Sequence, residues 1–331
     1  MEAPSGTHQL SRRAIMQAAG TAALAVGLAG TAQSAQAVVA PQARGRRVLR
    51  IGHLTDIHVQ PERKAGEGLA ACLHHVQSMK DKPDVIFTGG DLVMDSIGAD
   101  EARTRTQWDV FTRVLRGECS LPVEHCIGNH DCWGLNKKDS KTTGAERLYG
   151  KKWILETLGL PNRYRSFDKA GWHMIVLDST FPVEGGYTAK LDDEQFEWLK
   201  SDLTKADPKK PVLVLSHIPI LSASAYFDDE NEKSGNWVVP GAWMHIDARK
   251  IKDLFLKHPN VKLCLSGHIH LVDRVDYLGV TYLCNGAVCG GWWKGPYEEC
   301  DAGYAVVDLY ADGSFENQYI NYGWKPAPEP G

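Results

Sequence analysis

Short apolar runs and longer amphipathic segments alternate along most of the chain. The apolar runs are of strand length, and several end in glycine or polar residues; they lie at residues 47–56, 84–91, 122–131, 172–179, 210–219 and 260–270. Segments with apolar residues at helical spacing separate them, at residues 68–80, 101–116, 193–204 and 247–257. Helices that alternate with buried strands predict an α/β layered fold.

The C-terminal part of the chain has a different pattern. Residues 274–288 and 303–322 alternate apolar and polar positions, which is typical of antiparallel strands. No internal repeat and no linker-like composition interrupts residues 47–325. We therefore expect one domain over residues 47–325, followed by a short tail at 326–331.

Composition and charge restrict the possible partners. With 331 residues, of which 43% are hydrophobic, the chain can bury a sizeable core. Its formal net charge is -4, its isoelectric point is about 6.4, and it has no long basic run. Because a general nucleic-acid-binding surface needs clustered positive charge, the composition argues against nucleic acid as a partner.

The N-terminal residues have the pattern of an export signal. Residues 11–17 contain a twin arginine, a Gly- and Ala-rich apolar stretch follows, and residues 35–37 form an A-x-A cleavage site. This order resembles a Tat-type signal peptide at residues 1–37, followed by a linker at 38–46. A membrane anchor or a disordered tail is the alternative. The apolar stretch is too short and too poor in large side chains for stable membrane insertion, so we expect export by the Tat machinery to the periplasm or the medium.

Polar residues that can bind metal follow five of the predicted strands. In α/β folds, ligands bind beyond the carboxyl ends of the strands. The polar residues at these ends are Asp56 and His58, Asp91, Asn129 with His130 and Asp131, His217, and finally His268 and His270. Each piece alone is weak evidence, because a single D-x-H arises by chance and a lone histidine is more often a core or surface residue. Their order and placement together predict a metal site.

The spacing of these residues has a physical explanation. In an extended segment, residues two apart point to the same side. Asp56 and His58 can then reach one ion, and His268 and His270 offer two nitrogens to one region. Carboxylate, amide and imidazole ligands together suit Mn, Fe or Zn better than Ca or Mg.

Glycines precede several of these ligands. Gly90, Gly128 and Gly267 let the backbone turn tightly and leave room for ions. Two ions about 3.5–4 Å apart need a bridging carboxylate and can hold a water between them.

The motifs TDIH, GGD, GNHD, SHIP and GHIH, in this order across residues 55–270, resemble the five signature blocks of the calcineurin-like metallophosphoesterase superfamily. Their layout is most similar to that of the cyclic-nucleotide phosphodiesterase branch. The resemblance implies a four-layer αββα sandwich with two transition-metal ions, either both divalent or Fe(III) with a divalent ion. It implies that the first ion is bound by Asp56, His58 and His270, that the second is bound by Asn129, His217 and His268, and that Asp91 bridges them.

The resemblance also implies a reaction. A hydroxide held between the two metals would attack phosphorus, and His130 would act as general acid on the leaving group. Asp131 or Asp95 could orient His130. Purple acid phosphatases have a tyrosine ligand just after the GGD motif. This chain reads GGDLVMD, with Val93 and Met94 in that region, so an iron-tyrosinate centre is not expected.

Candidate substrate-binding residues lie in two irregular segments. Trp292 and Trp293 are adjacent, so one could line the pocket while the other packs in the core, and Lys294 could contact a phosphate. Residues 222–247 are polar, aromatic and irregular, and could form a substrate-gating loop or a surface insertion. His245, near the end of this segment, is a weak candidate for substrate contact.

The sequence therefore predicts an exported dinuclear-metal phosphoesterase that hydrolyses a small phosphodiester. An exported phosphatase acting on monoesters at the same site is the alternative. A nuclease is disfavoured by the negative net charge. A non-catalytic metal-binding protein is disfavoured because all seven predicted ligands and His130 are present.

Overall fold

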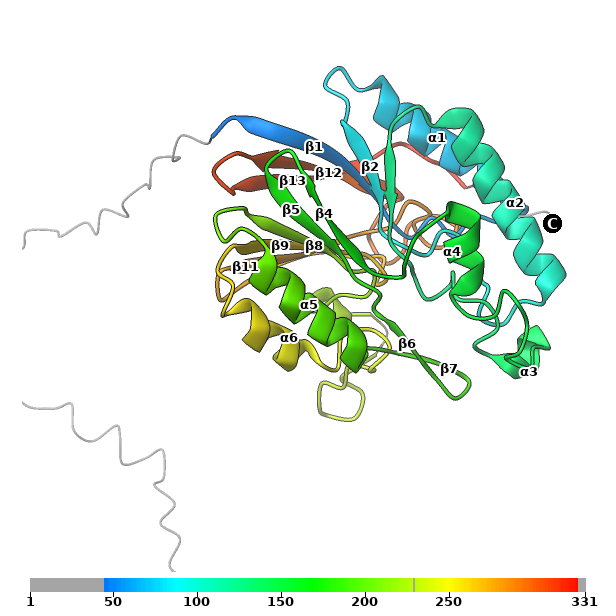
Figure 1. Ribbon diagram of the computed structural model, residues 1–331. Helices are drawn as coiled ribbons and strands as arrows, with labels where there is room; N and C mark the ends of the chain where they lie inside the picture. Colours follow the sequence, from blue (N-terminus) through cyan, green and yellow to red (C-terminus); the bar gives the residue numbers. More distant parts are fainter. Residues whose placement is uncertain (1–44, 229, 327–331) are drawn as a thin grey trace, which may run out of the picture. The chain divides into compact units, whose positions relative to one another are not determined.

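Two β-sheets packed face to face, each with helices on its outer side, form the described part of the protein (Figure 1). The computed structural model describes residues 45–228 and 230–326, which fall within one unit, Arg44–Gly331. The predicted signal peptide, most of the predicted linker and most of the predicted tail lie outside the described residues. No helix among the described residues is long and apolar enough to cross a membrane.

The first sheet has five strands in the order β13-β12-β1-β2-β3. Their bounds are β1 Arg47–Leu54, β2 Val85–Thr88, β3 Val123–His125, β12 Gly303–Tyr310 and β13 Phe315–Asn321. β1, β2 and β3 are parallel, whereas β12 is antiparallel to both of its neighbours. The carboxyl ends of three consecutive parallel strands therefore meet at one edge of this sheet.

The second sheet has six strands in the order β10-β11-β9-β8-β5-β4. Their bounds are β4 Arg165–Lys169, β5 Trp172–Val176, β8 Val212–Leu215, β9 Val261–Ser266, β10 Val272–Tyr277 and β11 Val280–Asn285. The four central strands are parallel, and β10 and β4 close the edges in the antiparallel sense.

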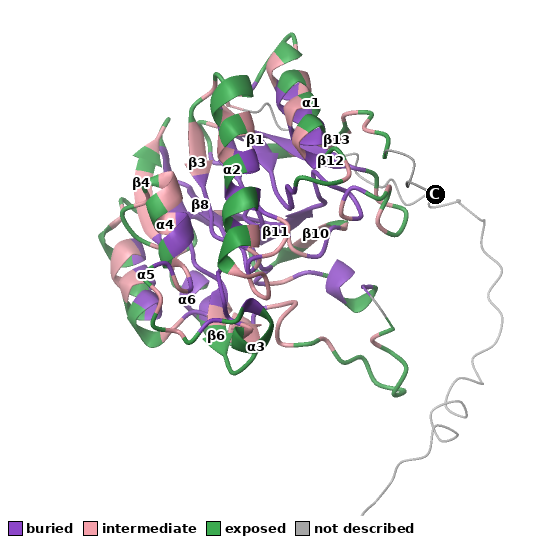
Figure 2. Cartoon of the chain, turned by 90° about the vertical axis from the view of Figure 1, so that its right-hand side faces the viewer, coloured by how far each residue is buried: buried purple, intermediate pink, exposed green. Residues whose placement is uncertain are grey.

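Two pairs of helices form the outer layers. α1 (Ala65–Ser78) and α2 (Glu101–Glu118) cover the first sheet, and α5 (Asp193–Lys205) and α6 (Ala248–Phe255) cover the second. Their inner faces are buried and their outer faces exposed, as the colours of α1 and α2 in Figure 2 show. The shorter elements are α3 Lys137–Ser140, α4 Lys152–Leu158, the hairpin β6 Thr180–Val183 and β7 Gly186–Ala189, and a 3₁₀ turn, η1, at Ser224–Tyr226.

The core between the sheets consists of the continuous apolar runs of the sequence. Ile51 and Phe87 from the first sheet pack in one cluster with Trp172, Met174 and Leu265 from the second, and all five are buried. Such strands are buried on both faces because helices cover the side that does not face the other sheet. The predicted α/β four-layer αββα sandwich is confirmed.

The predicted helices and strands are present, but the strands are shorter than expected. β1, for example, ends at Leu54 rather than continuing to residue 56. β4 and the β6–β7 hairpin escaped prediction because each has only four or five residues, too few for a periodic pattern.

Candidate metal centre and active-site pocket

The two sheets bring the predicted ligands together at a single edge. Asp56 and His58 follow β1, Asp91 follows β2, and Asn129 follows β3 by four residues. His217 follows β8, and His268 and His270 follow β9. Backbone hydrogen bonds join these strand ends: the amides of Ile57 and His58 both donate to the Asp91 carbonyl at 2.9 Å. We call the seven predicted ligands the floor; they are Asp56, His58, Asp91, Asn129, His217, His268 and His270.

The backbone of the floor is not extended, contrary to the expectation from the two-residue spacing. φ is 53° at Asp56, 45° at His58, 73° at His268 and 63° at His270, so all four residues lie in the left-handed region. This conformation is uncommon for residues other than glycine, and it is found where the surrounding structure enforces it, often at functional sites. The paired residues therefore converge because the chain coils tightly after each strand, not because side chains alternate along a strand.

Two glycines make room for the buried carboxylates. A Cβ at Gly128 would lie 2.1 Å from the Asp91 nitrogen, and one at Gly267 would lie 2.1 Å from Asp56 Oδ2. Neither position can carry a side chain without displacing a floor residue. The space beside these two glycines, which we expected to leave room for ions, is thus occupied by Asp91 and Asp56.

One half of the floor gathers three side chains around a common point. Asp56 Oδ1 lies 3.5 Å from His270 Nε2 and 4.0 Å from His58 Nε2. The two histidine Nε2 atoms lie 3.1 Å apart. The other oxygen of Asp56 accepts the Thr55 hydroxyl at 2.6 Å, and the His268 amide donates to both oxygens, so the carboxylate is fixed in this orientation.

The positions of the protons on the His58 and His270 rings indicate what kind of group fits between them. His58 Nδ1 faces the Met94 carbonyl at 3.3 Å, and His270 Nδ1 faces the Gly290 carbonyl at 2.7 Å. A carbonyl only accepts, so in each neutral ring Nδ1 carries the proton and Nε2 presents a lone pair. Two such nitrogens and a carboxylate oxygen that face one another need positive charge among them, from a proton shared between the rings or from a metal ion. The arrangement therefore fits a metal ion.

In the other half of the floor, too, one ring nitrogen of each histidine faces a backbone carbonyl. His217 Nδ1 faces the Gly89 carbonyl at 2.8 Å, which leaves Nε2 at 3.1 Å from Asp91 Oδ2 and 3.1 Å from Asn129 Oδ1. His268 Nε2 faces the Ala242 carbonyl at 3.0 Å and leaves Nδ1. Asp91, His217 and His268 offer ligand atoms that lie within 4.8 Å of one another. The amide nitrogen of Asn129 has no hydrogen-bond partner in the described residues.

Asp91 lies between the two halves. Its Oδ2 is 3.1 Å from His217 Nε2 and 3.6 Å from His58 Nε2, while its Oδ1 accepts the His130 amide at 2.8 Å. Asp91 is only 1% exposed, so its carboxylate can contact only groups inside the site. Asp91 Oδ2 therefore lies within reach of both halves of the floor.

The titration of the floor histidines reflects the same shortage of positive charge. Burial lowers the pKa of His58 and of His268 to about 3, so both are neutral and able to ligate. Burial also opposes the charged form of His217, but the carboxylates of Asp91 and Asp56 outweigh it and raise the pKa to about 9. Burial opposes the charged form of His270 as well, but Cys289 and Asp56 outweigh it and raise the pKa of His270 well above its ordinary value. Protons on His217 and His270 thus supply the charge that metal ions would supply.

His130 lies at the edge of the floor and faces the pocket. Its ring is 4.8 Å from that of His58, edge to face, and its Nδ1 lies 3.6 Å from Asp95 Oδ1. Burial lowers the pKa of His130, but the carboxylates of Asp91 and Asp95 outweigh it and raise the pKa above its ordinary value. Of the two carboxylates that could orient His130, Asp95 is the one beside the ring.

Asp131 has a different environment. Its Oδ1 accepts the Leu92 amide at 2.8 Å, and its Oδ2 accepts the Gly128 amide at 2.9 Å. The carboxylate is buried and ties the segment after β2 to the turn after β3. This position supports the backbone that carries Asp91 and Asn129 rather than the ring of His130.

A pocket of about 410 Å³ opens above the floor. His58, Asp91, His130, His268 and His270 line its base. Aromatic and acidic residues line its sides, five of them from loops and one, Tyr187, from strand β7. We call these six the wall: Tyr187, Asp228, Trp243, Trp292, Tyr297 and Glu298. The sequence pointed to the segments that carry most of the wall but, apart from Trp292, not to its residues. Their only signal was an excess of aromatic and acidic residues in irregular segments after strands.

The predicted substrate-binding residues divide between wall and core. Trp292 lines the pocket, with its ring 4.7 Å from that of His270. Trp293 is 1% exposed, packs on Trp324, and donates its indole N–H to the His58 carbonyl at 3.0 Å, so it is a core residue behind the floor. Lys294 is exposed and does not line the pocket.

His245 is buried at the end of the segment that carries Asp228 and Trp243, and its amide donates to the Pro219 carbonyl at 3.0 Å. Its Nδ1 lies 2.9 Å from Asp247 Oδ1, and its Nε2 lies 3.4 Å from the Ser216 hydroxyl. It does not line the pocket. The structure therefore places His245 in the support of the loop rather than at the substrate.

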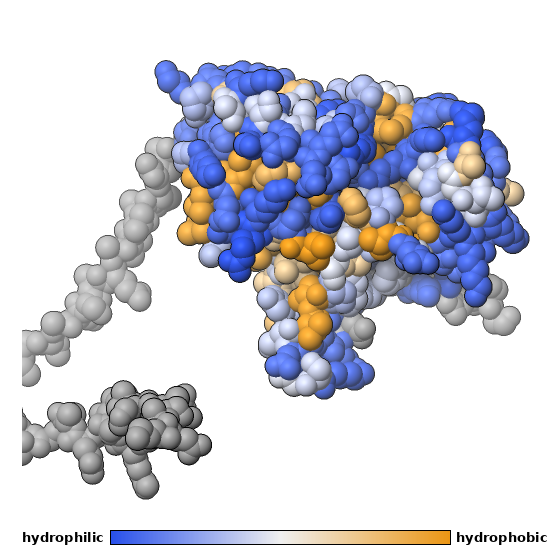
Figure 3. All heavy atoms as spheres, turned by 60° about the horizontal axis from the view of Figure 1, so that its bottom comes forward, coloured by the Kyte–Doolittle hydropathy of each residue, from blue (hydrophilic) through white to orange (hydrophobic). Residues whose placement is uncertain are grey.

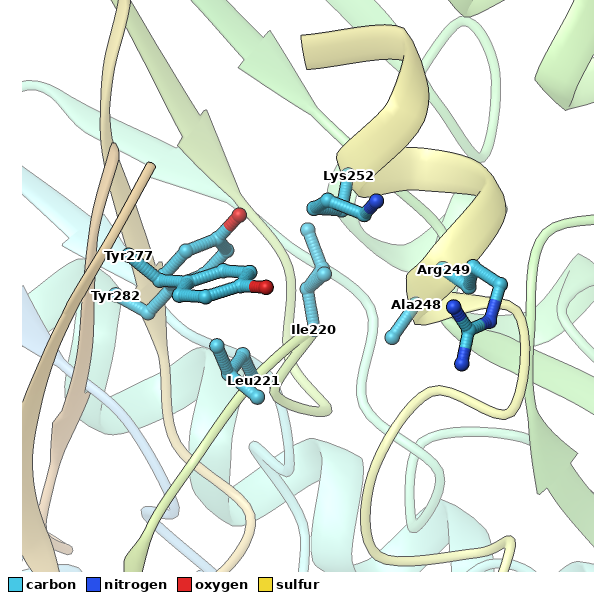
Figure 4. Close-up of a pocket in the computed structure, with 7 residues that line it drawn as sticks. All are labelled: Ile220, Leu221, Ala248, Arg249, Lys252, Tyr277 and Tyr282. Atoms are coloured by element: carbon cyan, nitrogen blue, oxygen red, sulfur yellow. The ribbon is translucent and has the colours of Figure 1, made fainter. Parts of the chain in front are cut away.

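A second hollow, of about 190 Å³, lies between helix α6 and the β10–β11 edge. Figure 4 shows Tyr277 and Tyr282 side by side, facing Ile220 and the helix residue Lys252. None of the predicted site residues lines this hollow. The chemistry of the strand ends is thus confined to the pocket above the floor.

A layered α/β sandwich with imidazole and carboxylate side chains gathered at its strand ends is an arrangement that suits a metal-dependent enzyme. The sequence model of the family described as calcineurin-like phosphoesterase matches residues 49–272, and the chain belongs to this family. It is therefore a hydrolase that acts on phosphate esters. The family depends on two metals, and the histidine and aspartate clusters of the floor fit this requirement.

Several curated proteins are similar to this chain. A 3′,5′-cyclic-nucleotide phosphodiesterase of Nostoc is 24% identical over 81% of this chain and 90% of its own length. The 3′,5′-cyclic adenosine monophosphate phosphodiesterase of Escherichia coli is 23% identical over 83% of this chain and 90% of its own length. Purple acid phosphatase 21 of Arabidopsis thaliana is 29% identical, but over only 50% of this chain and 34% of its own length.

Solved structures support the fold. A dimetal phosphatase from Danio rerio superposes with a TM-score of 0.57 at 16% identity, covering 84% of this chain and 100% of its own. GAP50, described as the anchor in the inner membrane complex of Plasmodium, superposes with a TM-score of 0.52 at 18% identity, covering 84% and 86%.

Proposed function

We propose that this protein is a phosphodiesterase whose floor holds two transition-metal ions. The observation that carries the proposal is the convergence of imidazole nitrogens, two carboxylates and one amide oxygen in two adjoining groups. Asp56, His58 and His270 would hold the first ion. Asn129, His217 and His268 would hold the second, and Asp91 Oδ2 would contact both. Nitrogen and oxygen donors of this kind suit Mn, Fe or Zn.

The bound metals would lower the pKa of a water for attack on phosphorus and neutralise charge on the phosphoryl oxygens. The residues of the chain would orient the His130 ring and supply a proton to the leaving oxygen. His130 faces the pocket beside His58 and would donate a proton to the leaving oxygen. Asp95, at 3.6 Å from His130 Nδ1, would keep this ring protonated and aimed at the pocket. Asp131 would act indirectly, by fixing the backbone segments that carry Asp91 and Asn129.

The charge of the pocket favours a diester over a monoester. A diester carries one negative charge at neutral pH, whereas a monoester carries up to two. Among the described residues that line the pocket, none is lysine or arginine, and Asp228 and Glu298 lie in the wall. Two relatives that align with this chain over 90% of their own length are named as cyclic-nucleotide phosphodiesterases, which supports the same preference.

A phosphatase acting on monoesters is the second candidate. Purple acid phosphatases from Arabidopsis thaliana are similar to part of this chain. Val93 and Met94, next to β2, leave no tyrosine at the position that those enzymes use. A nuclease is less favoured still, because the pocket offers no basic side chain for a phosphate backbone. We also propose that the protein is exported through the Tat machinery, on the twin-arginine pattern of residues 11–17 alone.

The test compares two chromogenic substrates on the purified protein loaded with Mn(II). We expect bis-p-nitrophenyl phosphate to be hydrolysed with a kcat/KM at least about tenfold above that for p-nitrophenyl phosphate. A preference for the monoester would contradict the diesterase assignment and favour the phosphatase. No turnover of either substrate by a protein that holds two metals would contradict an enzymatic role.

A further inference from the structure

The wall of the pocket has a composition that the hydrolysis of a phosphate ester does not require. Phosphate-binding sites usually add arginine, lysine or backbone amides to the metals, because the substrate is an anion. Here the described wall consists of four aromatic residues and two carboxylates. These aromatic rings and the two carboxylates of Asp228 and Glu298 lie at the sides of the pocket, above the floor.

Two loops from distant parts of the chain join to form this wall. Tyr297, in the loop after β11, donates its hydroxyl hydrogen to Asp228 Oδ1, in the loop after β8, at 2.5 Å. Asp228 is buried, 8% exposed, although it lies in a segment that is otherwise largely exposed and projects from the molecule (Figure 3). Glu298 is exposed at the opening of the pocket. One carboxylate thus lies inside the wall and one at its entrance.

The aromatic rings stand next to the floor. The rings of Trp292 and Tyr297 are 5.1 Å apart and nearly perpendicular, and both contact His270, at 4.7 and 5.7 Å between ring centroids. A group bound against Trp292 and Tyr297 is therefore within a few ångströms of the first half of the floor. A small diester can reach both places at once.

Aromatic faces and carboxylates together stabilise a cation. An ammonium group near the face of tryptophan or tyrosine gains about 0.5–2 kcal/mol, most when it is shielded from water. A carboxylate nearby adds attraction of the same sign, whereas a second anionic group would be repelled. The wall thus discriminates between the substituents of a phosphodiester by their charge.

We propose that the substrate is a small phosphodiester with an ammonium group on one of its two alcohols. The phosphate lies at the floor, and the ammonium group lies against Trp292 and Tyr297, near the carboxylates of Asp228 and Glu298. This inference rests on the proposed function, since it needs the diester to be bound at the floor. It goes beyond that function by assigning the charge of the substrate and the residues that select it.

The test uses a matched pair of substrates with the Mn(II)-loaded protein. p-Nitrophenyl phosphocholine carries a trimethylammonium group, and p-nitrophenyl 3,3-dimethylbutyl phosphate has the same shape with a carbon in place of the nitrogen. We expect kcat/KM to be about tenfold higher for the cationic substrate. Choline should also compete with bis-p-nitrophenyl phosphate, and 3,3-dimethylbutanol should not, which reports on binding rather than turnover.

Variants assign the preference to the wall. Glu298→Gln and Trp292→Leu should each bring the ratio of the two kcat/KM values down severalfold. Glu299→Gln removes the same charge from an exposed neighbour that does not line the pocket, so it should leave the ratio unchanged. An equal decrease in Glu298→Gln and Glu299→Gln would show a general effect of net charge and would overturn the assignment of the wall.

The outcomes separate this inference from the proposed function. If the wild-type protein hydrolyses bis-p-nitrophenyl phosphate but handles the matched pair equally, the inference fails and the phosphodiesterase stands. If it hydrolyses no diester, the proposed function itself fails. Glycerophosphocholine and phosphatidylcholine vesicles, at equal headgroup concentration, distinguish a soluble substrate from a lipid. Turnover of neither would overturn the proposal.

Discussion

The floor and the wall of the pocket are adjacent but are built in opposite ways. Every side chain of the floor belongs to a strand end, nearly all are buried, and each histidine is fixed by a backbone carbonyl at its second nitrogen. The wall comes mostly from loops, with Tyr187 on strand β7, and its rings are half-buried. A hydrogen bond from Tyr297 to Asp228 joins its two main loops. The floor is therefore suited to hold ions rigidly, and the wall to select what is attached to the phosphate.

This difference separates chemistry from specificity. A change in the floor should alter the number of bound metals or the rate of the chemical step for every phosphodiester. A change in the wall should alter the ranking of substrates and leave the metals in place. Substitutions in the two regions can therefore show whether the division is real.

The largest effect is expected at the residue shared by the two halves of the floor. Asp91→Ala removes the oxygen that lies within 3.6 Å of both His58 and His217. We expect the hydrolysis rate to fall by more than about 10³-fold and the protein to retain fewer than two metal ions per chain. Metal analysis and kinetics on the same sample check this. Two ions bound to an Asp91→Ala chain would refute the bridging role.

His130→Gln should be the next most damaging change, and it should leave both metals bound. We expect a loss of about 10²–10⁴-fold, because a general acid contributes that much. The loss should be smaller when p-nitrophenol leaves than when a simple alkyl alcohol leaves, since p-nitrophenolate needs less protonation. Equal losses with the two leaving groups would argue that His130 only positions the phosphate.

Asp95 and Asp131 provide a matched pair beside His130. Asp95→Asn removes a charge 3.6 Å from His130 Nδ1, and we expect kcat to fall about tenfold with little change in melting temperature. Asp131→Asn removes an acceptor of buried amides, so it should cost about 1–3 kcal/mol of unfolding free energy. The reverse pattern in thermal melts and kinetics would exchange their roles.

The smallest effect is expected at the adjacent tryptophans, which separate wall from core within one dipeptide. Trp293→Phe leaves a cavity and an unpaired His58 carbonyl, so unfolding free energy should fall by about 1–3 kcal/mol. Trp292→Phe should leave stability nearly unchanged and raise KM a fewfold. Thermal melts and Michaelis–Menten kinetics of both variants measure the contrast. A large loss of stability in Trp292→Phe would place this residue in the core.

The sequence was sufficient to predict the fold and to find the floor. Apolar runs of strand length alternate with amphipathic helices, and polar residues interrupt the runs where five strands end. The position of Asp91 after β2 and of His268 and His270 after β9 is a local property of these motifs. The sheet order then brings them together because parallel strands share one edge.

Other features depend on tertiary contacts that no local pattern contains. Asp56 and His58 have left-handed backbone conformations, which residue spacing alone did not indicate. Asp228 and Tyr297 are 69 residues apart in irregular segments, so their contact has no sequence signal. For the same reason the sequence could not decide which of Trp292 and Trp293 faces the pocket.

The most direct test of the central claim is a metal titration of the purified protein after removal of all metal by a chelator. Mn(II) is added stepwise, and bound metal per chain and the rate of bis-p-nitrophenyl phosphate hydrolysis are measured in the same samples. We expect the rate to reach its maximum only when two ions are bound per chain. Full activity with one bound ion, or with none, would contradict the assignment of the floor as a dinuclear centre.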